Sequence, residues 1–276
     1  MKITIHNKRF CRVEAERNLT ILQISDVHYD ATECDRALLT KHLKEAEKIG
    51  ALVFCNGDWF DLMQGKKDPR GSYNSLRPEY KGIDYLDLVI QESAEFLSQF
   101  NLTYIFAQGN HETNITERMH HNPLSALCML LKMKGREAHL LGYDGYIQYS
   151  FHQKGNSAGY LQYFHHGYGG AAPRSKGILN ADLNQAAYPD ADLYTTGHTH
   201  NKTYLPMIVE RVDVRNFTIK EEQVIHLQTG SYKKLSSMGW AKEKGFKATP
   251  LGGWFVELSH HRTREKSYVN AKVYEA

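Results

Sequence analysis

Short hydrophobic runs and helical patterns alternate through the first half of the chain. Apolar runs at 19–24, 51–55 and 102–107 have the length of buried strands, and each ends abruptly at polar residues. Apolar residues recur at helix-face spacing over about 34–49, 84–99 and 123–134. The first half is therefore predicted to alternate strands with helices.

Strands dominate the rest of the pattern. An N-terminal hairpin is predicted from 3–5 and 10–13, and a single helical pattern near 176–187 interrupts the second half. The other predicted strands are 139–141, 146–152, 160–164, 193–195, 203–210, 212–219, 224–228, 254–258 and 268–273. This order favours an α/β fold of mixed sheets covered by helices. No repeat or domain boundary is visible, so we expect one domain over 1–276 with a polar inserted loop at 64–82.

Composition narrows the class of protein. The chain has 276 residues, 41% hydrophobic and 24% charged, as in soluble globular proteins. Its net charge of +3 suits an anionic ligand but is small for a dedicated nucleic-acid binder. No run approaches the roughly 20 apolar residues that span a bilayer, and residues 1–18 lack the apolar stretch of a signal peptide. Four scattered cysteines fit reduced thiols, so we expect a cytoplasmic protein without membrane contact.

Polar clusters follow directly after five of the predicted strands. They contain six of the fifteen histidines, and their neighbours are Asp, Asn or Gly. The clusters are Asp26 with His28, Asp58, Asn110 with His111, His165 with His166, and His198 with His200. In open α/β folds, ligands bind beyond the carboxyl ends of strands, so the five clusters predict one shared site.

The donors in these clusters predict bound metal. Oxygen and imidazole donors without cysteine suit Mn²⁺, Fe²⁺ or Zn²⁺, and so many donors suit two ions that share a carboxylate. In an extended chain, residues i and i+2 point to the same side, so Asp26 and His28 are expected to reach one ion. The same spacing makes the imidazoles of His198 and His200 converge. Flanking glycines predict tight turns: Gly57, Gly109, Gly167 and Gly197.

These clusters resemble the sequence blocks of a known superfamily. The blocks are Asp26-Val27-His28, Gly57-Asp58-Trp59-Phe60-Asp61, Gly109-Asn110-His111-Glu112, His165-His166-Gly167 and Gly197-His198-Thr199-His200. Their types and order are similar to those of calcineurin-like metallophosphoesterases of bacterial or phage type, over residues 26–200. The resemblance implies a four-layer αββα sandwich of two mixed β-sheets flanked by helices.

The resemblance also implies roles. Asp26, His28 and His200 would hold the first metal, and Asn110, His166 and His198 the second. Asp58 would bridge the two, a metal-bridging hydroxide would attack the phosphorus, and His111 would act as general acid. The expected ions are two Mn²⁺, with Fe²⁺, Zn²⁺ and Mg²⁺ as alternatives.

Several positions carry two interpretations. His166 is favoured over His165 as the ligand, with His165 on the opposite face of the strand. Asp61 and Glu112 either orient a site residue or cap their own backbone. Trp59, Phe60 and Trp254 are expected in the core, and the pairs His120-His121 and His260-His261 at the surface. Four residues are candidate substrate contacts, unless their segments are solvated loops: Arg70, Tyr73, Arg77 and Arg174.

Three functions follow from this pattern. The first is a phosphodiesterase or phosphomonoesterase that acts on a phosphate ester, with a nucleotide or nucleic acid as possible substrate. The second is a nuclease that acts on DNA or RNA, which the modest charge disfavours. The third is a non-catalytic scaffold with the same fold, which the complete set of metal-binding residue types disfavours. No oligomeric state is predicted.

Overall fold

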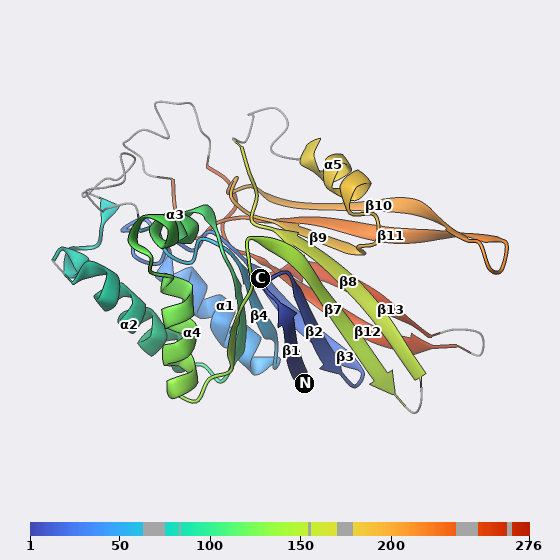
Figure 1. Ribbon diagram of the computed structural model, residues 1–276, viewed down its shortest axis with the longest axis horizontal. Coiled ribbons are helices and arrows are strands. Elements are labelled where there is room, and N and C mark those ends of the chain that lie inside the picture. Colours follow the sequence, from blue (N-terminus) through green and yellow to red (C-terminus); the bar gives the residue numbers. More distant parts are fainter. Residues whose placement is uncertain (63–74, 83, 154–155, 170–178, 236–247, 264–266) are drawn as a thin grey trace.

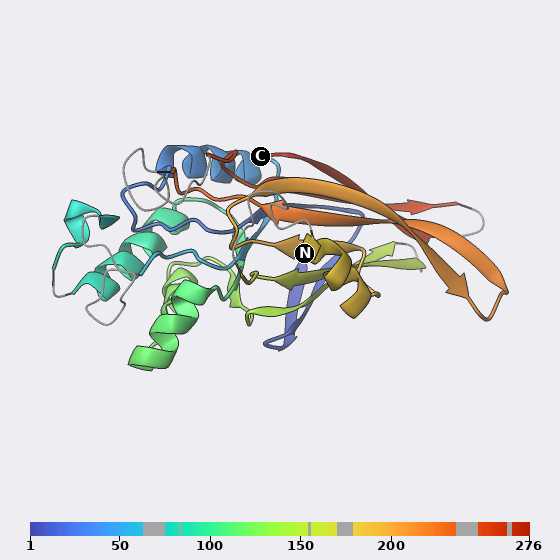
Figure 2. The same cartoon turned by 90° about the horizontal axis from the view of Figure 1, so that it is seen from above.

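Two β-sheets pack face to face, and helices lie on their outer sides (Figures 1 and 2). The computed structural model describes residues 1–62, 75–82, 84–153, 156–169, 179–235, 248–263 and 267–276. Side chains of both sheets form a shared core, in which the rings of Phe54 and Phe164 lie 5.3 Å apart. The predicted α/β architecture of two mixed sheets with flanking helices is confirmed.

The six-stranded sheet has the order β13-β12-β3-β4-β5-β6. Its strands are β3 (Asn18–Ile24), β4 (Leu52–Asn56), β5 (Thr103–Ala107), β6 (Ala138–Leu140), β12 (Trp254–Arg262) and β13 (Ser267–Glu275). Strands β3 to β6 are parallel, so their carboxyl ends lie at one edge of the sheet. Any side chains that follow these strands are thereby brought close together.

Helices cover the outer face of this sheet. They are α1 (Arg36–Lys48), α2 (Tyr85–Ser98), α3 (Asn110–Met119) and α4 (Pro123–Met133). α1 begins after Asp35, whose side chain accepts a hydrogen bond from the amide of Leu38 at 3.0 Å. Leu39, Leu43 and Ala46 lie on one face of α1 and are buried in the core beneath it.

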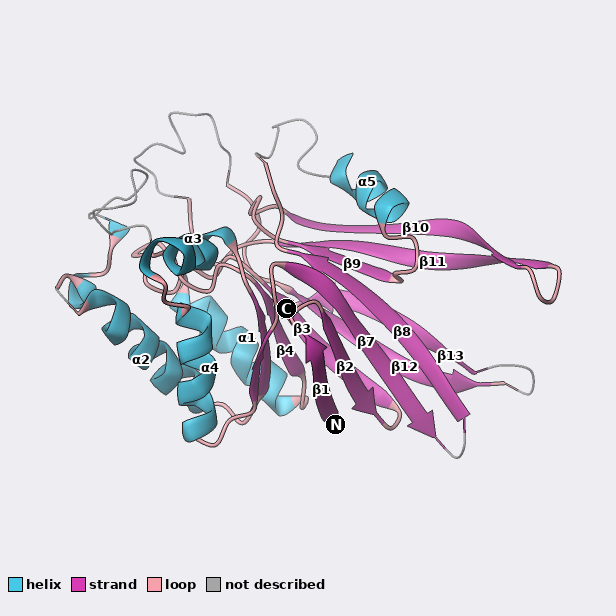
Figure 3. Cartoon of the chain, viewed as in Figure 1, coloured by secondary structure: helices cyan, strands magenta, loops and turns pink. Residues whose placement is uncertain are grey.

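The seven-stranded sheet has the order β1-β2-β7-β8-β9-β11-β10. Its strands are β1 (Lys2–Asn7), β2 (Phe10–Ala15), β7 (Asp144–Gln153), β8 (Asn156–His165), β9 (Leu193–Thr196), β10 (Lys202–Asp213) and β11 (Thr218–Thr229). The helix α5 (Leu179–Ala187) packs on its outer face, beside β9 (Figure 3). A small apolar cluster there contains Tyr163, Tyr194 and Val224.

One element prediction is wrong, and one helix is missing from the prediction. The predicted strand at 212–219 is instead the end of a long hairpin, since Val212 in β10 pairs with Ile219 in β11. The turn between them is held by Asp213, whose side chain accepts from the amides of Arg215 and Asn216. The helix α3 is absent from the predicted pattern because only Glu112 and Ile115 are buried on it, so no apolar stripe marks it.

The predicted loop insertion at 64–82 lies largely outside the described residues. Its described end, residues 75–82, packs against the fold rather than extending into solvent: Leu76 and Tyr80 are buried, and Leu76 pairs with Ala31. Trp59, Phe60 and Trp254 are buried, as predicted, whereas His260, predicted at the surface, is buried as well. Within the described ranges, no helix combines the length and apolar character needed to cross a lipid bilayer.

Candidate metal centre

Polar side chains gather where the strands of both sheets end. Asp26 and His28 follow β3, Asp58 follows β4, and Asn110 begins α3 directly after β5. From the other sheet, His166 follows β8, and His198 and His200 follow β9. The structure brings all seven predicted ligands together and sorts their donor atoms into two groups.

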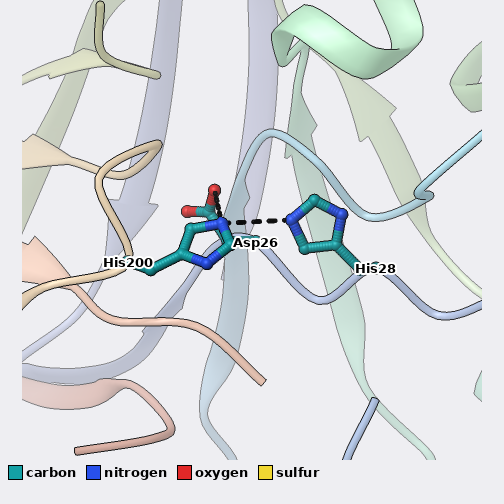
Figure 4. A group of neighbouring side chains, drawn as sticks. All are labelled: Asp26, His28 and His200. Carbon is teal, nitrogen blue, oxygen red and sulfur yellow. Dashed lines mark hydrogen bonds and ion pairs between the residues drawn. The ribbon is translucent and has the colours of Figure 1, made fainter. Parts of the chain in front are cut away.

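The first group consists of Asp26, His28 and His200 (Figure 4). His200 Nε2 lies 3.2 Å from His28 Nε2 and 3.3 Å from Asp26 Oδ1. Asp26 and His28 are buried, whereas the His200 side chain is 37% exposed and forms the solvent side of the group. Three donor atoms from two distant segments therefore converge on one point.

The second group consists of Asp58, Asn110, His166 and His198. His166 Nε2 lies 3.1 Å from Asp58 Oδ2 and 3.2 Å from Asn110 Oδ1. His198 Nδ1 lies 2.8 Å from the same amide oxygen. The amide of His198 also donates to the Asp26 carboxylate at 2.9 Å, which connects the two groups directly.

His165 and His166 make different contacts. His166 is fully buried among the ligands, and its Nδ1 donates to the carbonyl oxygen of Asn56 at 2.7 Å. That hydrogen bond leaves Nε2 with its lone pair toward Asp58 and Asn110. His165 Nδ1 instead accepts from the amide of Gly167 at 2.8 Å. The geometry thus favours His166 as the ligand.

The backbone at the ligands differs from the sequence-based expectation. Asp26 and His28 were expected to share a side because the chain is extended, but their φ angles are 50° and 49°, in the left-handed region. The same holds for His198 at 65° and His200 at 56°. Asp26 and His28 nevertheless lie in the same group, as predicted. His198 and His200 contribute to different groups, contrary to the prediction that their imidazoles converge.

Two glycines are required for close approach at the centre. Gly57 has a φ of +88°, and a Cβ atom there would collide with the ring of His166 and lie 2.7 Å from the Cα of Gly109. A Cβ atom on Gly109 would collide with the side chain and amide of Asp58. The loops after β4 and β5 can touch only because neither residue has a side chain.

Asp61 contacts the Nδ1 atoms of two histidines of the centre. Its Oδ1 lies 2.8 Å from His28 Nδ1 and accepts a hydrogen bond from Lys233 Nζ at 2.7 Å. Its carbonyl oxygen accepts a hydrogen bond from His111 Nδ1. Burial alone would lower the pKa of Lys233, but contact with Asp61 outweighs it and raises that pKa, so the ammonium stays charged. Of the two interpretations of Asp61, the structure supports the one in which it orients site residues.

Glu112 holds the loop that carries Asp58. Its carboxylate accepts from the amides of Gly109 at 3.0 Å, Asp58 at 3.1 Å and Phe60 at 3.1 Å, and the side chain is fully buried. Glu112 therefore both caps α3 and fixes the backbone at Asp58, so the two interpretations of this residue hold together.

Replacing Glu112 with glutamine is expected to lower the free energy of unfolding by about 1–3 kcal/mol, because an amide NH₂ cannot accept from a backbone N–H and leaves a buried donor unpaired. Urea unfolding of the apo protein measures this loss. Glu117→Gln is the matched control, since Glu117 lies on the same helix and is exposed. Equal stability of the two variants would show that Glu112 does not hold the loop.

His111 lies beside the second group without belonging to it. Its Nε2 is 3.6 Å from Asp58 Oδ2, its amide donates to Asp58 Oδ1 at 3.0 Å, and its ring stands edge-on to that of His28 at 4.8 Å. Burial acts to lower the pKa of His111, but the carboxylates of Asp58 and Asp61 outweigh it and raise that pKa. The imidazole is fixed through Nδ1 and faces the centre with Nε2.

The charge balance of the centre fits bound cations. Burial would lower the pKa of His166, yet Asp58 and Asp26 raise it to about 10. The two carboxylates therefore create a negative electrostatic potential that favours a positive charge beside His166 Nε2. A divalent cation meets this demand while neutral imidazoles donate their lone pairs, and oxygen and nitrogen donors suit Mn²⁺, Fe²⁺ or Zn²⁺. The residues present therefore fit metal ions in both groups.

Only one of the four candidate substrate contacts lies within the described residues. Arg70, Tyr73 and Arg174 are outside them. Arg77 donates to the carbonyl oxygens of Ala31 and Cys34, both at 3.1 Å, which ties it to the loop after β3. The structure thus assigns Arg77 a contact with backbone rather than with the centre.

Sequence reasoning missed two residues of the centre. Asp30 is buried and accepts from the amides of Asp61 at 2.6 Å and Leu62 at 3.1 Å. Asp26, His28 and Asp30 are spaced by two residues each, and this repeat could have indicated Asp30. Lys233 had no comparable signal, because it lies in a segment after β11 that carries none of the motif residues.

A comparison with protein families places this sequence in a known family. A sequence model described as calcineurin-like phosphoesterase matches residues 19–202, a range that contains all seven candidate ligands. A comparison with curated proteins found no significant match.

Three solved structures are similar in outline. GAP50, the anchor in the inner membrane complex of Plasmodium, is 14% identical over 94% of this chain and 85% of its own, with a TM-score of 0.44. Vacuolar Protein Sorting 29 from Cryptosporidium parvum is 15% identical over 95% of this chain and 100% of its own, with a TM-score of 0.37. A conserved uncharacterized protein from Streptococcus pneumoniae, a predicted phosphoesterase, is 12% identical over 94% of this chain and 100% of its own, with a TM-score of 0.31. All three TM-scores lie below 0.5, so the assignment rests on the sequence match. That match covers two thirds of the chain, and the protein belongs to the calcineurin-like phosphoesterase family.

Proposed function

We propose that the protein hydrolyses phosphate esters with two divalent metal ions. Asp26, His28 and His200 would hold the first ion. Asn110, His166 and His198 would hold the second, and the carboxylate of Asp58 would contribute to both. The observation that carries the proposal is the convergence of two donor groups, joined by the 2.9 Å contact between the amide of His198 and Asp26.

When bound, the two cations would neutralise the phosphate oxygens and lower the pKa of a water molecule to near neutrality. The chain's own residues orient the reaction. Asp61 fixes the Nδ1 side of His111 through its carbonyl oxygen, so Nε2 faces the centre. From there His111 can donate a proton to the leaving oxygen of the ester.

The finer assignments are proposals as well. We propose Mn²⁺ as the ion, with Fe²⁺, Zn²⁺ or Mg²⁺ as alternatives that the same donors accept. We propose action in the cytoplasm, because the four cysteines are all free and buried: Cys11, Cys34, Cys55 and Cys128. Either a diester or a monoester fits the centre.

Hydrolysis of bis-p-nitrophenyl phosphate and p-nitrophenyl phosphate, with EDTA and after Mn²⁺ is restored, tests the reaction. We expect turnover that EDTA abolishes and Mn²⁺ recovers, because the ions carry most of the charge stabilisation. Single-stranded DNA in a salt series tests the nuclease alternative, for which activity should fall steeply with salt. Loss of every activity in metal-loaded, folded protein would contradict the proposal and favour the scaffold.

A further inference from the structure

The hairpin of β10 and β11 reaches beyond the other strands of the fold (Figures 1 and 2). Near the body, its inner face belongs to the core between the sheets, where Ile225 and Leu227 are buried. Pro206 pairs with Ile225, and side chains two residues apart share a face, so Ile208 and Val212 lie on this inner face as well. They are nevertheless 63% and 67% exposed. The apolar face of the hairpin is therefore longer than the sheet that covers it.

Further large apolar side chains lie at the end of the hairpin. Ile219 pairs with Val212 across the strands, and Val214 and Phe217 follow in the turn. Phe217 is 93% exposed, more than any other large apolar side chain of the described residues. We call these five residues the hairpin patch: Ile208, Val212, Val214, Phe217 and Ile219. An exposed apolar patch of this kind is typical of an interaction site.

The opposite face of the hairpin end has the composition of a solvent-exposed surface. Arg211 Nε lies 2.9 Å from Glu222 Oε2, and Lys220 Nζ lies 3.5 Å from Asp213 Oδ2. Charges of opposite sign are thus paired on that face. The hairpin end is therefore amphipathic, and its apolar side is the one that a partner would cover.

Two carboxylates on the apolar side have no counter-charge. Glu210 and Glu221 are directly opposite each other, both are exposed, and neither forms an ion pair within the described ranges. Like charges directly opposite each other on a sheet are destabilising. Along β10, Glu210 lies between Ile208 and Val212. The patch therefore suits a cation that is flanked by apolar groups.

The backbone of β10 offers a place for such a partner. β10 is the outermost strand of its sheet, so one of its edges is paired with no other strand that the structure describes. An extended segment can add to such an edge, although Pro206 lacks an N–H and confines the pairing to the part of β10 beyond it. A residue opposite Glu210 shares its face, and the residues two positions away on either side lie opposite Ile208 and Val212.

We propose that the hairpin patch and the edge of β10 bind an extended segment of a partner protein. The segment carries a lysine or arginine with an apolar residue two positions away on either side, and its cation contacts Glu210 and Glu221. A second copy of this chain is disfavoured, because a two-fold contact of the patch with itself brings carboxylates together. An anionic membrane repels the same carboxylates. The proposal is independent of the phosphoesterase function.

Fluorescence anisotropy of the labelled peptide Thr-Val-Thr-Lys-Thr-Val-Thr with the full chain tests the charge of the partner. We expect saturable binding, and about tenfold weaker binding of the same peptide with glutamate in place of lysine. Glu221→Gln should weaken binding of the lysine peptide about threefold. Glu222→Gln is the matched control and should bind as the wild type does, because Glu222 is the next residue on β11 and faces the opposite side.

Ile208→Thr tests the apolar part of the patch and should weaken binding about tenfold. The variant should fold, because Ile208 is mostly exposed and threonine favours strands. Ile5→Thr is its control, since Ile5 is exposed on β1 at the other edge of the same sheet. Absence of saturable binding, or an equal loss in a variant and its control, would overturn the inference. So would a dimer in sedimentation, or binding to phosphatidylglycerol vesicles, that Ile208→Thr abolishes.

Discussion

Asp58→Asn is expected to reduce turnover of bis-p-nitrophenyl phosphate by on the order of 10³-fold or more and to reduce the bound Mn²⁺ from two ions toward one. Asp58 Oδ2 lies 3.1 Å from His166 Nε2, and the side chain is 2% exposed. Burial would raise the pKa of Asp58, but His111 and His166 outweigh it and hold that pKa well below its usual range. The substitution replaces the only carboxylate of the second ligand group with a neutral amide. It thereby removes the negative charge that two cations would share.

Metal content after Mn²⁺ loading and gel filtration, measured beside kcat, checks this expectation. Asparagine keeps an oxygen that can accept from the amide of His111, as Asp58 Oδ1 does at 3.0 Å, so the fold should survive. Asp190→Asn, at an exposed position, is the matched control and should retain both metal and turnover. Full metal content with kcat within threefold of the wild type would show that Asp58 is not the bridge.

The position of the centre could be predicted because it depends on strand order. Each polar cluster follows an apolar run, and parallel strands bring their carboxyl ends to one edge, so Asp26, Asp58 and Asn110 meet there. The boundaries of the central strands were also readable. For example, the run at 19–24 matches β3 (Asn18–Ile24), since a strand covered on both faces is mostly apolar, with Thr20 and Gln23 as the polar exceptions here.

The local conformation at the ligands could not be predicted. Left-handed φ angles at Asp26, His28 and Asp58 are uncommon for residues other than glycine, and the modest preference of Asp and His for this region is too weak to locate them. They are held by contacts across loops, such as the amide of Asp26 with the carbonyl of Gly57 at 3.1 Å. Because these contacts join segments far apart in the chain, they appear only once the sheet is assembled.

Residues from distant segments that position the ligands could not be predicted for the same reason. Lys233 reaches Asp61 across 172 positions of sequence at 2.7 Å, and nothing near Lys233 indicates that neighbour. Helix α3 could not be predicted because its first residues contact the centre and its sequence forms no continuous apolar stripe. Its first residues, Asn110 and His111, face the ligands, and Glu112 holds the loop of Asp58.

His111→Ala is expected to lower kcat for an ester with an alkyl leaving group by about 10²–10⁴-fold, the range for loss of a general acid. The loss for a p-nitrophenyl ester should be much smaller, because p-nitrophenolate departs without a proton. Metal content should stay at the wild-type level, since His111 Nε2 lies 3.6 Å from Asp58 and its Nδ1 is bound to Asp61. His261→Ala, at an exposed position, serves as the control.

The comparison between leaving groups separates three roles of His111. Equal losses for both esters would mean that His111 binds the phosphate instead of protonating the leaving oxygen, because binding acts on both substrates alike. A drop in bound Mn²⁺ would make it a ligand, and Asp61 would then orient two ligands through His28 and His111. A selective loss with full metal content is the result that the geometry predicts, since Asp61 holds the ring while Nε2 is turned toward the centre.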